Sequence, residues 1–120
     1  DSESKGVYQG KIFVKDVAQK TDAYQLSKAI LLSERSEFDS KPELEIYADD
    51  VKCSHGSTSG SLDKDSIYYL MTRGLSKKES TKLLVNGFLN EVTESIKSNS
   101  IKNFIKNKLE EQLSNEYKKD

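Results

Sequence analysis

The chain of 120 residues has no tryptophan and only one cysteine, one histidine, one proline and one methionine. A single cysteine cannot form an internal disulfide bond, so the sequence favours a reducing compartment and leaves the thiol available for chemistry. No apolar run approaches the length of about 18 residues that a membrane-spanning helix needs, and no charged, apolar and small-residue leader is recognisable. We therefore expect neither a transmembrane helix nor a signal peptide.

Neither sign of charge dominates: 19 basic residues stand against 20 acidic residues, for a formal net charge of −1. This balance creates no strong field, so it favours neither nucleic acid nor a membrane as the partner. Only 34% of the residues are hydrophobic and the mean hydropathy is −0.73, both low for an independent globule. The values suit an elongated fold with a narrow core, or a part of something larger.

The first part of the chain, as far as Leu62, has the composition of β-strands. Residues 7–17 are rich in β-branched and aromatic residues, and residues 29–32 form an apolar run too short for a helix. Polar segments separate these short runs. The pattern favours the stacked coils of a β-solenoid over a sandwich.

The alternation of apolar residues changes partway between residues 43 and 55. Six apolar or site candidates stand on the two sides of the change: Leu44, Ile46 and Ala48 before it, and Val51, Cys53 and His55 after it. Successive side chains of a strand point to opposite faces, so the two groups have opposite parity. A corner or bulge at Asp49–Asp50 would let all six point inward.

The second part of the chain, from Asp63, carries the signals of helix ends. Asp63 can cap a short helix that ends at Arg73 and Gly74, with glycine at the position that favours left-handed backbone. Ser76 and Glu79 have the spacing of a capping box, in which each residue closes an open backbone N–H of the other.

Apolar residues at helical spacing follow the capping box. The second helix has the predicted stripe Leu84, Phe88, Val92 and Ile96. A third helix, from about residues 99–100, has the predicted stripe Ile101, Phe104, Ile105, Leu109 and Leu113. Amphipathic helices of this kind either pack on the strands or offer a face to another protein.

The candidate functional site consists of Cys53 and His55, the only cysteine and the only histidine of the chain. Residues two apart on an extended strand share one face, so both side chains should project together. A thiolate beside an imidazole can bind a soft or borderline metal or trap sulfur, but two ligands do not complete a metal site. Either a partner supplies the remaining ligands, or both side chains are structural and fill the strand interior.

Two nearby motifs have ordinary structural explanations. Residues 56–60 read GSTSG, but Thr58 occupies the centre and the strand-to-helix turn of a nucleophile elbow is missing. Asp49 and Asp50 are adjacent, so on a strand they point to opposite faces and cannot readily act as a carboxylate pair. The sequence has no phosphate loop, so we expect any ATP hydrolysis to take place in another subunit.

Three stretches resemble a known family: residues 10–14 (GKIFV), residues 19–25 (QKTDAYQ) and above all residues 41–56 (KPELEIYADDVKCSHG). They resemble the C-terminal part of SufD-type members of the SufB/SufD family, which are scaffold proteins of iron–sulfur cluster assembly. The resemblance extends over roughly residues 6–92. Gly56 matches the C-S-H-G pattern of the SufD type, whereas the SufB type usually reads C-x-H-E-A.

The resemblance implies an α+β fold, with end coils of a right-handed parallel β-helix over residues 1–62 and a C-terminal α-helical domain over residues 63–120. It implies a non-catalytic scaffold that pairs with a SufB-like paralogue through the β-helix. A SufC-type ATPase would dock on the helices, and this chain itself would bind no nucleotide. The candidate contacts for the ATPase are Tyr69, Arg73, Gly74 and Phe88.

In such a scaffold, a nascent iron–sulfur cluster or its precursor is held transiently at the interface shared with SufB. The matching histidine here is His55, with Cys53 beside it, and the SufB-like partner supplies a cysteine. Imidazole is a weaker iron ligand than thiolate, which suits transient holding. The resemblance also implies that most of the β-helix lies upstream of Asp1, so an exposed coil end could pair two copies as a homodimer.

Two other functions are compatible with the residues alone. The chain could be a purely structural β-helix module, with Cys53 and His55 as core residues. It could also be an independent metallohydrolase that uses these two residues and an aspartate. The lysine-rich, arginine-poor composition favours the stroma of a plastid-type organelle, the apicoplast, with a bacterial cytoplasm as the alternative.

Overall fold

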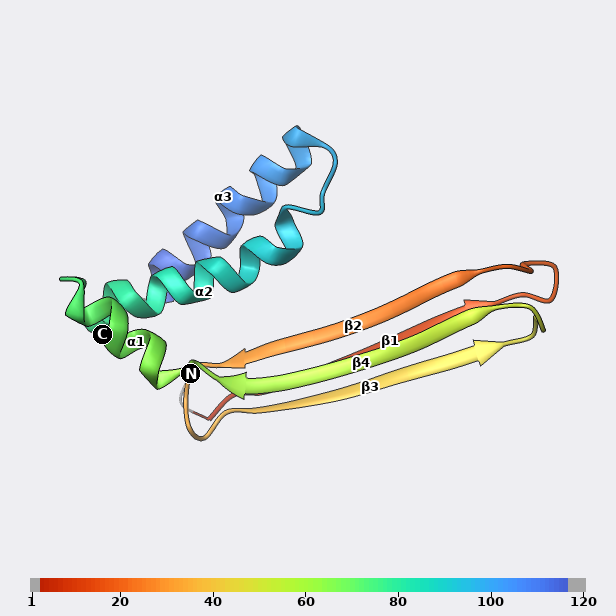
Figure 1. The fold of residues 1–120 in the computed structure, drawn as a ribbon, viewed down its shortest axis with the longest axis horizontal. Helices are drawn as coiled ribbons and strands as arrows, with labels where there is room; N and C mark the ends of the chain where they lie inside the picture. The colour runs from red at the N-terminus through yellow and green to blue at the C-terminus, as the bar shows by residue number, and fades with distance from the viewer. Residues whose placement is uncertain (1–2, 117–120) are drawn as a thin grey trace. The chain divides into compact units, whose positions relative to one another are not determined.

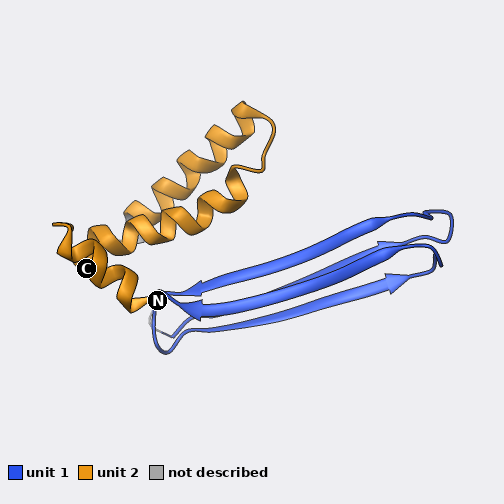
Figure 2. Cartoon of the chain, in the orientation of Figure 1, with its two compact units in different colours: residues 1–62 blue, residues 63–120 orange. Residues whose placement is uncertain are grey.

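The computed structural model describes residues 3–116, with side chains described as far as residue 114. The chain divides into two compact units, residues 1–62 and residues 63–120 (Figure 2). The described part of the first unit consists of strands and their connections, and that of the second consists of helices.

The strands of the first unit are β1 (Lys5–Val14), β2 (Asp22–Leu31), β3 (Glu37–Ile46) and β4 (Lys52–Ser61). They form two parallel two-stranded sheets, one from β1 and β3 and the other from β2 and β4 (Figure 1). Lys5 lies opposite Glu37 in the first sheet, and Asp22 lies opposite Lys52 in the second. The two strands of each pair are therefore separated in sequence by one strand of the other sheet. That strand is part of the crossover connection that a parallel pair requires.

Each sheet has one covered face and one exposed face. On β1, Val14 is 3% exposed whereas its neighbour Phe13 is 51% exposed. On β2, Ser27 is 8% exposed whereas Tyr24 is 63% exposed. Residues paired in register point to the same side of a sheet, so the inward positions are even-numbered on β1 and β3 and odd-numbered on β2 and β4.

The connection between β3 and β4 contains the predicted corner at Asp49–Asp50, and the parity of the inward residues changes there as predicted. Hydrogen bonds hold the corner against the connection between β1 and β2. The N–H of Lys20 donates to the carbonyl of Asp50 at 2.6 Å, and the N–H of Asp50 donates to the Gln19 side chain at 2.9 Å. The two connections therefore lie side by side.

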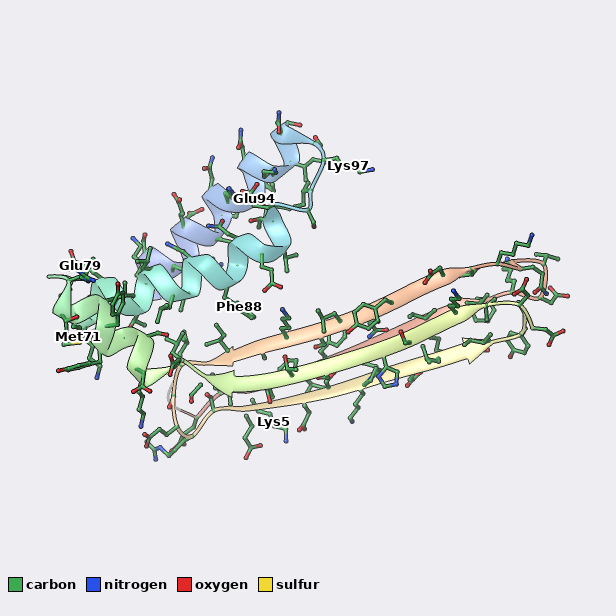
Figure 3. All side chains as sticks on the ribbon, in the orientation of Figure 1. Lys5, Met71, Glu79, Phe88, Glu94 and Lys97 are labelled. Atoms are coloured by element: carbon green, nitrogen blue, oxygen red, sulfur yellow. The ribbon has the colours of Figure 1, made fainter. Side chains whose placement is uncertain are left out.

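The exposed face of the β1–β3 sheet carries cross-strand ion pairs. Nζ of Lys5 lies 3.2 Å from Glu37 and 2.9 Å from Asp39, and Nζ of Lys11 lies 2.9 Å from Glu45 (Figure 3 labels Lys5). The hydrogen bond from Lys5 lowers the pKa of the Asp39 carboxyl. Ion pairs this exposed contribute little to stability, but they favour the observed strand register.

The helices of the second unit are α1 (Lys64–Thr72), α2 (Lys77–Thr93) and α3 (Asn99–Glu116). The predicted ends of α1 are confirmed: the Asp63 carboxylate accepts from the N–H groups of Asp65 and Ser66, and Gly74 has a φ of 98° after the helix. A side chain would strain the backbone at that φ, which is why glycine stands there. No helix within residues 3–116 combines the length and the apolar character needed to cross a bilayer.

The buried face of α2 lies beside the predicted stripe. Ser80 is fully covered, Val85 is 5% exposed and Thr93 is 4% exposed, whereas Val92 of the predicted stripe is 68% exposed. Leu84 and Phe88 of that stripe are partly buried, whereas Ile96 lies beyond the end of α2 at Thr93, so its assignment to this helix was wrong. Ser80 can be buried because its hydroxyl donates to the carbonyl of Ser76 at 2.9 Å. A hydrophobic pattern cannot detect such a residue, and the prediction was wrong for Val92.

The predicted start of α3 is confirmed, and its stripe is confirmed in part. Ile105, Leu109 and Leu113 are partly buried. Ile101 and Phe104 are 53% and 62% exposed, so their assignment to the packed face was wrong. Glu94, after the end of α2, joins the two helices by accepting from Lys102 at 3.1 Å and from Lys106 at 2.6 Å (Figure 3).

The capping box at the start of α2 gives a testable prediction. The N–H of Glu79 donates to the Ser76 hydroxyl at 3.2 Å, and the N–H of Ser76 donates to the Glu79 carboxylate at 2.8 Å. We expect Ser76→Ala to lower the free energy of unfolding by about 1 kcal/mol, because a backbone N–H loses its partner. Ser76→Thr should retain most of the stability. Chemical denaturation measures both variants, and equal losses would contradict the role of the hydroxyl.

The same capping box makes stability depend on pH. Hydrogen bonds from the hydroxyl and then the N–H of Ser76 lower the pKa of the Glu79 carboxyl (Figure 3 labels Glu79). A carboxyl whose pKa is lowered by folding stabilises the fold above its unfolded pKa, and this contribution is lost as the pH falls through the folded pKa. We expect acidification to destabilise Ser76→Ala less than the wild type. Denaturation curves at neutral and acid pH would show the difference, and parallel losses would exclude it.

Candidate functional site

Cys53 and His55 lie on β4 and, as their spacing predicts, share one face of the strand. In the register with β2, Cys53 lies opposite Ala23 and His55 lies opposite Gln25. Cys53 is a free, partly buried thiol, and His55 is exposed. The His55 ring is therefore accessible in the described part of the chain.

The glycine after His55 identifies the outward face of β4. A Cβ atom at Gly56 would lie 2.8 Å from the hydroxyl oxygen of Tyr24 and 3.5 Å from Cδ1 of Leu26. Tyr24 and Leu26 are 63% and 47% exposed, so they mark the outward face of this sheet. His55 has the opposite parity and therefore lies on the inward face with Gln25.

Polar side chains cross the inner space between the sheets beside His55. Nε2 of Gln25 donates to the Tyr8 hydroxyl at 3.3 Å, which joins β2 to β1. Gly10 leaves room for this bond, because a Cβ atom there would overlap with the ends of both side chains. The surroundings of the His55 position are thus partly polar, although the face is inward.

The chain's own ligands do not complete a metal site. Within residues 3–116, no group of three or more histidine, cysteine, aspartate or glutamate side chains could hold a metal ion. The metallohydrolase interpretation needs an aspartate beside Cys53 and His55, and the described part of the chain contradicts it. A stable iron site at this position would require ligands from another molecule.

Three of the four candidate partner contacts, Tyr69, Arg73 and Gly74, lie at the C-terminal end of α1. The guanidinium carbon of Arg73 lies 5.2 Å from the centre of the Tyr69 ring, a cation–π distance. Gly74 follows directly and ends the helix. Tyr69 is 56% exposed, so the group is accessible. Phe88 lies on α2 and is partly buried (Figure 3).

A depression of about 410 Å³ borders Tyr69 between α1 and α2. Its lining combines apolar side chains with two carboxylates: Asp63, Asp65, Ser66, Tyr69, Leu70, Leu83 and Leu84. Phe88 is not part of it. Sequence reasoning missed Leu83, which is 51% exposed, because the residue lies off the predicted stripe of α2. The sequence contained a signal for Leu83, because an apolar residue outside the packed stripe of a surface helix is available for contact with another molecule.

The chain matches known proteins over most of its length. The family model described as "SUF system FeS cluster assembly, SufBD core domain" matches residues 1–88. The chain is 40% identical over 98 residues to the iron–sulfur cluster assembly protein SufD of Escherichia coli, covering 82% of this chain and 23% of that protein. It is 41% identical over 96 residues to an iron–sulfur cluster assembly SufBD family protein of Synechocystis, covering 80% and 21%.

A plant relative shows a similar relation. The chain is 36% identical over 106 residues to the chloroplastic protein ABCI7 of Arabidopsis thaliana, covering 88% of this chain and 22% of that protein. The chain therefore spans between about a fifth and a quarter of the length of the curated relatives that it matches.

Proposed function

Because the chain belongs to the SufBD core-domain family of iron–sulfur cluster assembly proteins, we propose that it acts as a SufD-type scaffold and not as an enzyme. Its cargo would be a nascent iron–sulfur cluster at an interface with a SufB-type partner. One observation carries the proposal. The only imidazole of the chain is exposed on a strand beside a partly buried thiol, and no third ligand joins them within residues 3–116.

In this proposal, the two sheets belong to successive coils of a right-handed parallel β-helix. β1 and β2 would form one coil, and β3 and β4 the next. The parallel pairing and the hydrogen bond between the two connections support this arrangement. Each described strand pairs with one other strand, so its second edge offers free backbone groups to further strands. A SufB-type β-helix that pairs along the β3–β4 edge would bring its own ligands close to His55.

Ligands divided between two chains suit a transient cargo. His55 and Cys53 would supply one or two ligands, and a cysteine of the SufB-type partner would supply another. Iron binds thiolate and imidazole, and the incomplete set on this chain alone would hold it weakly. Separation of the two chains would then dissolve the site and release the cluster. A chain with a complete set of ligands would lack this means of release.

The helical unit would dock a SufC-type ATPase. Tyr69, Arg73 and Gly74 lie beside the depression between α1 and α2, which offers both apolar and acidic groups. Phe88 would extend this surface along α2. A segment with apolar and basic side chains would complement it, because exposed apolar side chains supply contact area and carboxylates select charge. No nucleotide would bind to this chain itself.

The proposed compartment is a plastid-type organelle, such as the apicoplast, or a bacterial cytoplasm. The chloroplastic name of the Arabidopsis relative supports the first, and the Escherichia coli relative supports the second.

Co-purification with a SufB-type and a SufC-type protein tests the proposed function. We expect a stable complex that carries iron and sulfide after exposure to ferrous iron and a persulfide donor, whereas this chain alone should retain far less of both. Colorimetric iron and sulfide assays, normalised to protein, give the measurement. The proposal fails if the complex forms but carries no more iron and sulfide than the SufB-type protein alone.

A further inference from the structure

The connection between β1 and β2 holds the chain immediately before the site residues of β4. The N–H of Lys20 donates to the carbonyl of Asp50 at 2.6 Å, and the N–H of Asp50 donates to Oε1 of Gln19 at 2.9 Å. The N–H of Lys52, the first residue of β4, donates to the carbonyl of Thr21 at 2.9 Å. Three hydrogen bonds therefore hold residues 50–52, directly before the site thiol.

The Gln19 side chain is itself held in place. Its Nε2 donates to the carbonyl of Asp16 at 2.8 Å, while its Oε1 accepts from the N–H of Asp50. A primary amide offers both a donor and an acceptor, whereas a carboxylate offers only acceptors and an alkyl chain offers neither. Gln19 therefore bridges its own connection to the one between β3 and β4.

The backbone at Lys20 is held in an unusual conformation. Its φ is 64°, and among residues 3–116 it is the only residue other than glycine with a positive φ. A lysine is strained there, and such strain persists only where the surrounding structure maintains it. The bond from the Lys20 N–H to Asp50 is one contact that maintains it. The two connections thus hold each other in one particular shape.

The sequence of β4 does little to fix its own register. After His55 the strand consists only of glycine, serine and threonine, and within residues 3–116 it pairs only with β2. The register of a polar, glycine-rich strand is weakly specified, and a slip by one residue moves every side chain to the opposite face. Such a slip would turn Cys53 and His55 outward. The hold on residues 50–52 opposes this slip where β4 begins.

We propose that Gln19 is a positioning residue for the candidate site: its amide joins the two connections and fixes the start of β4 in the register that keeps Cys53 and His55 on the inward face. Gln19 acts through the backbone of residues 50–52 and not by contact with either side chain. Only the importance of this register for the cargo rests on the proposed function.

The reactivity of Cys53 tests this assignment, because the chain has a single cysteine and its thiol is partly buried. In the absence of denaturant, we expect Gln19→Ala to react with the thiol reagent DTNB about fivefold faster than the wild type, since loss of one hydrogen bond makes opening at the start of β4 more frequent. Gln19→Met, of similar length but without a polar group, should be equally fast. Gln19→Glu retains an acceptor for the N–H of Asp50 and should react at close to the wild-type rate.

Two further variants serve as controls. Val17→Ala changes an 81% exposed position on the same connection and should react at the wild-type rate. Phe38→Leu tests for an effect of general stability, because Phe38 is partly buried at the start of β3, far along the strand from the corner. Phe38→Leu should lower the stability in chemical denaturation but leave the thiol rate unchanged.

Lys20 provides a second test of the same hold. Glycine adopts a positive φ without strain, whereas a β-branched residue resists it. Lys20→Gly should therefore react no faster than the wild type, and Lys20→Val should react severalfold faster. Equal thiol rates in the wild type, Gln19→Ala and Gln19→Met would overturn the assignment. Equal acceleration in Gln19→Ala and Phe38→Leu would also overturn it, because the thiol would then react through general unfolding.

These measurements need no cluster, so this inference and the proposed function can fail independently. Unchanged thiol rates in Gln19→Ala, with cluster loss in the His55→Ala complex, would refute only the role of Gln19. A faster thiol reaction in Gln19→Ala, with normal cluster yield in the His55→Ala complex, would support the role of Gln19 in the fold of β4 and refute that of His55 as a ligand.

Discussion

Replacing His55 with alanine should remove most of the iron and sulfide from the complex while the chain keeps its fold. The ring is exposed, so truncation uncovers little apolar surface and should change the free energy of unfolding by less than about 0.5 kcal/mol. The cargo loses a direct ligand, and its affinity should fall by at least about 100-fold, more than for a supporting residue. Iron and sulfide assays on the purified complex measure the effect.

The control for this experiment is Ser57→Ala, an exposed position on the same face of β4. Its complex should carry wild-type amounts of iron and sulfide. A purely structural module predicts the reverse pattern, in which His55→Ala unfolds the chain by a few kcal/mol, as a buried truncation does, without a specific effect on the cluster. A His55→Ala complex that acquires cluster at normal yield would exclude His55 as a ligand.

Truncating Val85 should destabilise the helical unit far more than truncating Val92 on the same helix. Val85 is 5% exposed, and Val92 is 68% exposed. Removing two buried methyl groups from Val85 loses their transfer free energy and leaves a cavity, for a loss of about 2 kcal/mol. Val92→Ala should stay within about 0.5 kcal/mol of the wild type. Denaturant unfolding followed by circular dichroism at the helical wavelengths measures both.

The two variants form a matched pair, because both replace a valine by alanine within α2. The intrinsic helix preference therefore changes equally, and the difference reports burial alone. Equal stability losses would mean that α2 does not bury the face containing Ser80, Val85 and Thr93. The packed face of α2 would then have to include Val92, as the stripe predicted from the sequence does.

Local signals in the sequence predicted the helix ends well. Asp63 caps α1, Gly74 ends it with positive φ, and Ser76 and Glu79 form the predicted box. Each of these features depends on hydrogen bonds between residues at most four positions apart, so the sequence nearby contains the whole cause. The corner at Asp49–Asp50 was equally predictable, because it follows from alternation along one segment.

The buried faces were less predictable, because they depend on distant neighbours. Val85 and Val92 have the same side chain, yet only Val85 is covered, and the stripe pattern of α2 alone does not distinguish them. Ser80 is covered because its hydroxyl bonds within the helix, which no hydrophobicity pattern records. Propensity and spacing identify a helix, but its orientation comes from tertiary packing.

The candidate site shows the same division. The spacing of Cys53 and His55 was enough to predict that they share a face. Gln25 and Tyr8, 17 residues apart in sequence, meet only because two sheets face each other. No motif in the sequence connects these side chains to the histidine.

The most direct test of the central claim is pulsed electron paramagnetic resonance of the reduced complex. Because this chain has a single histidine, it can be labelled with ¹⁵N-histidine and assembled with an unlabelled SufB-type partner. If His55 binds the cluster, the hyperfine coupling to a ligand nitrogen should take the ¹⁵N pattern in the labelled complex and disappear in His55→Ala. A complex that carries the paramagnetic cluster but shows no coupling to ¹⁵N would contradict the account.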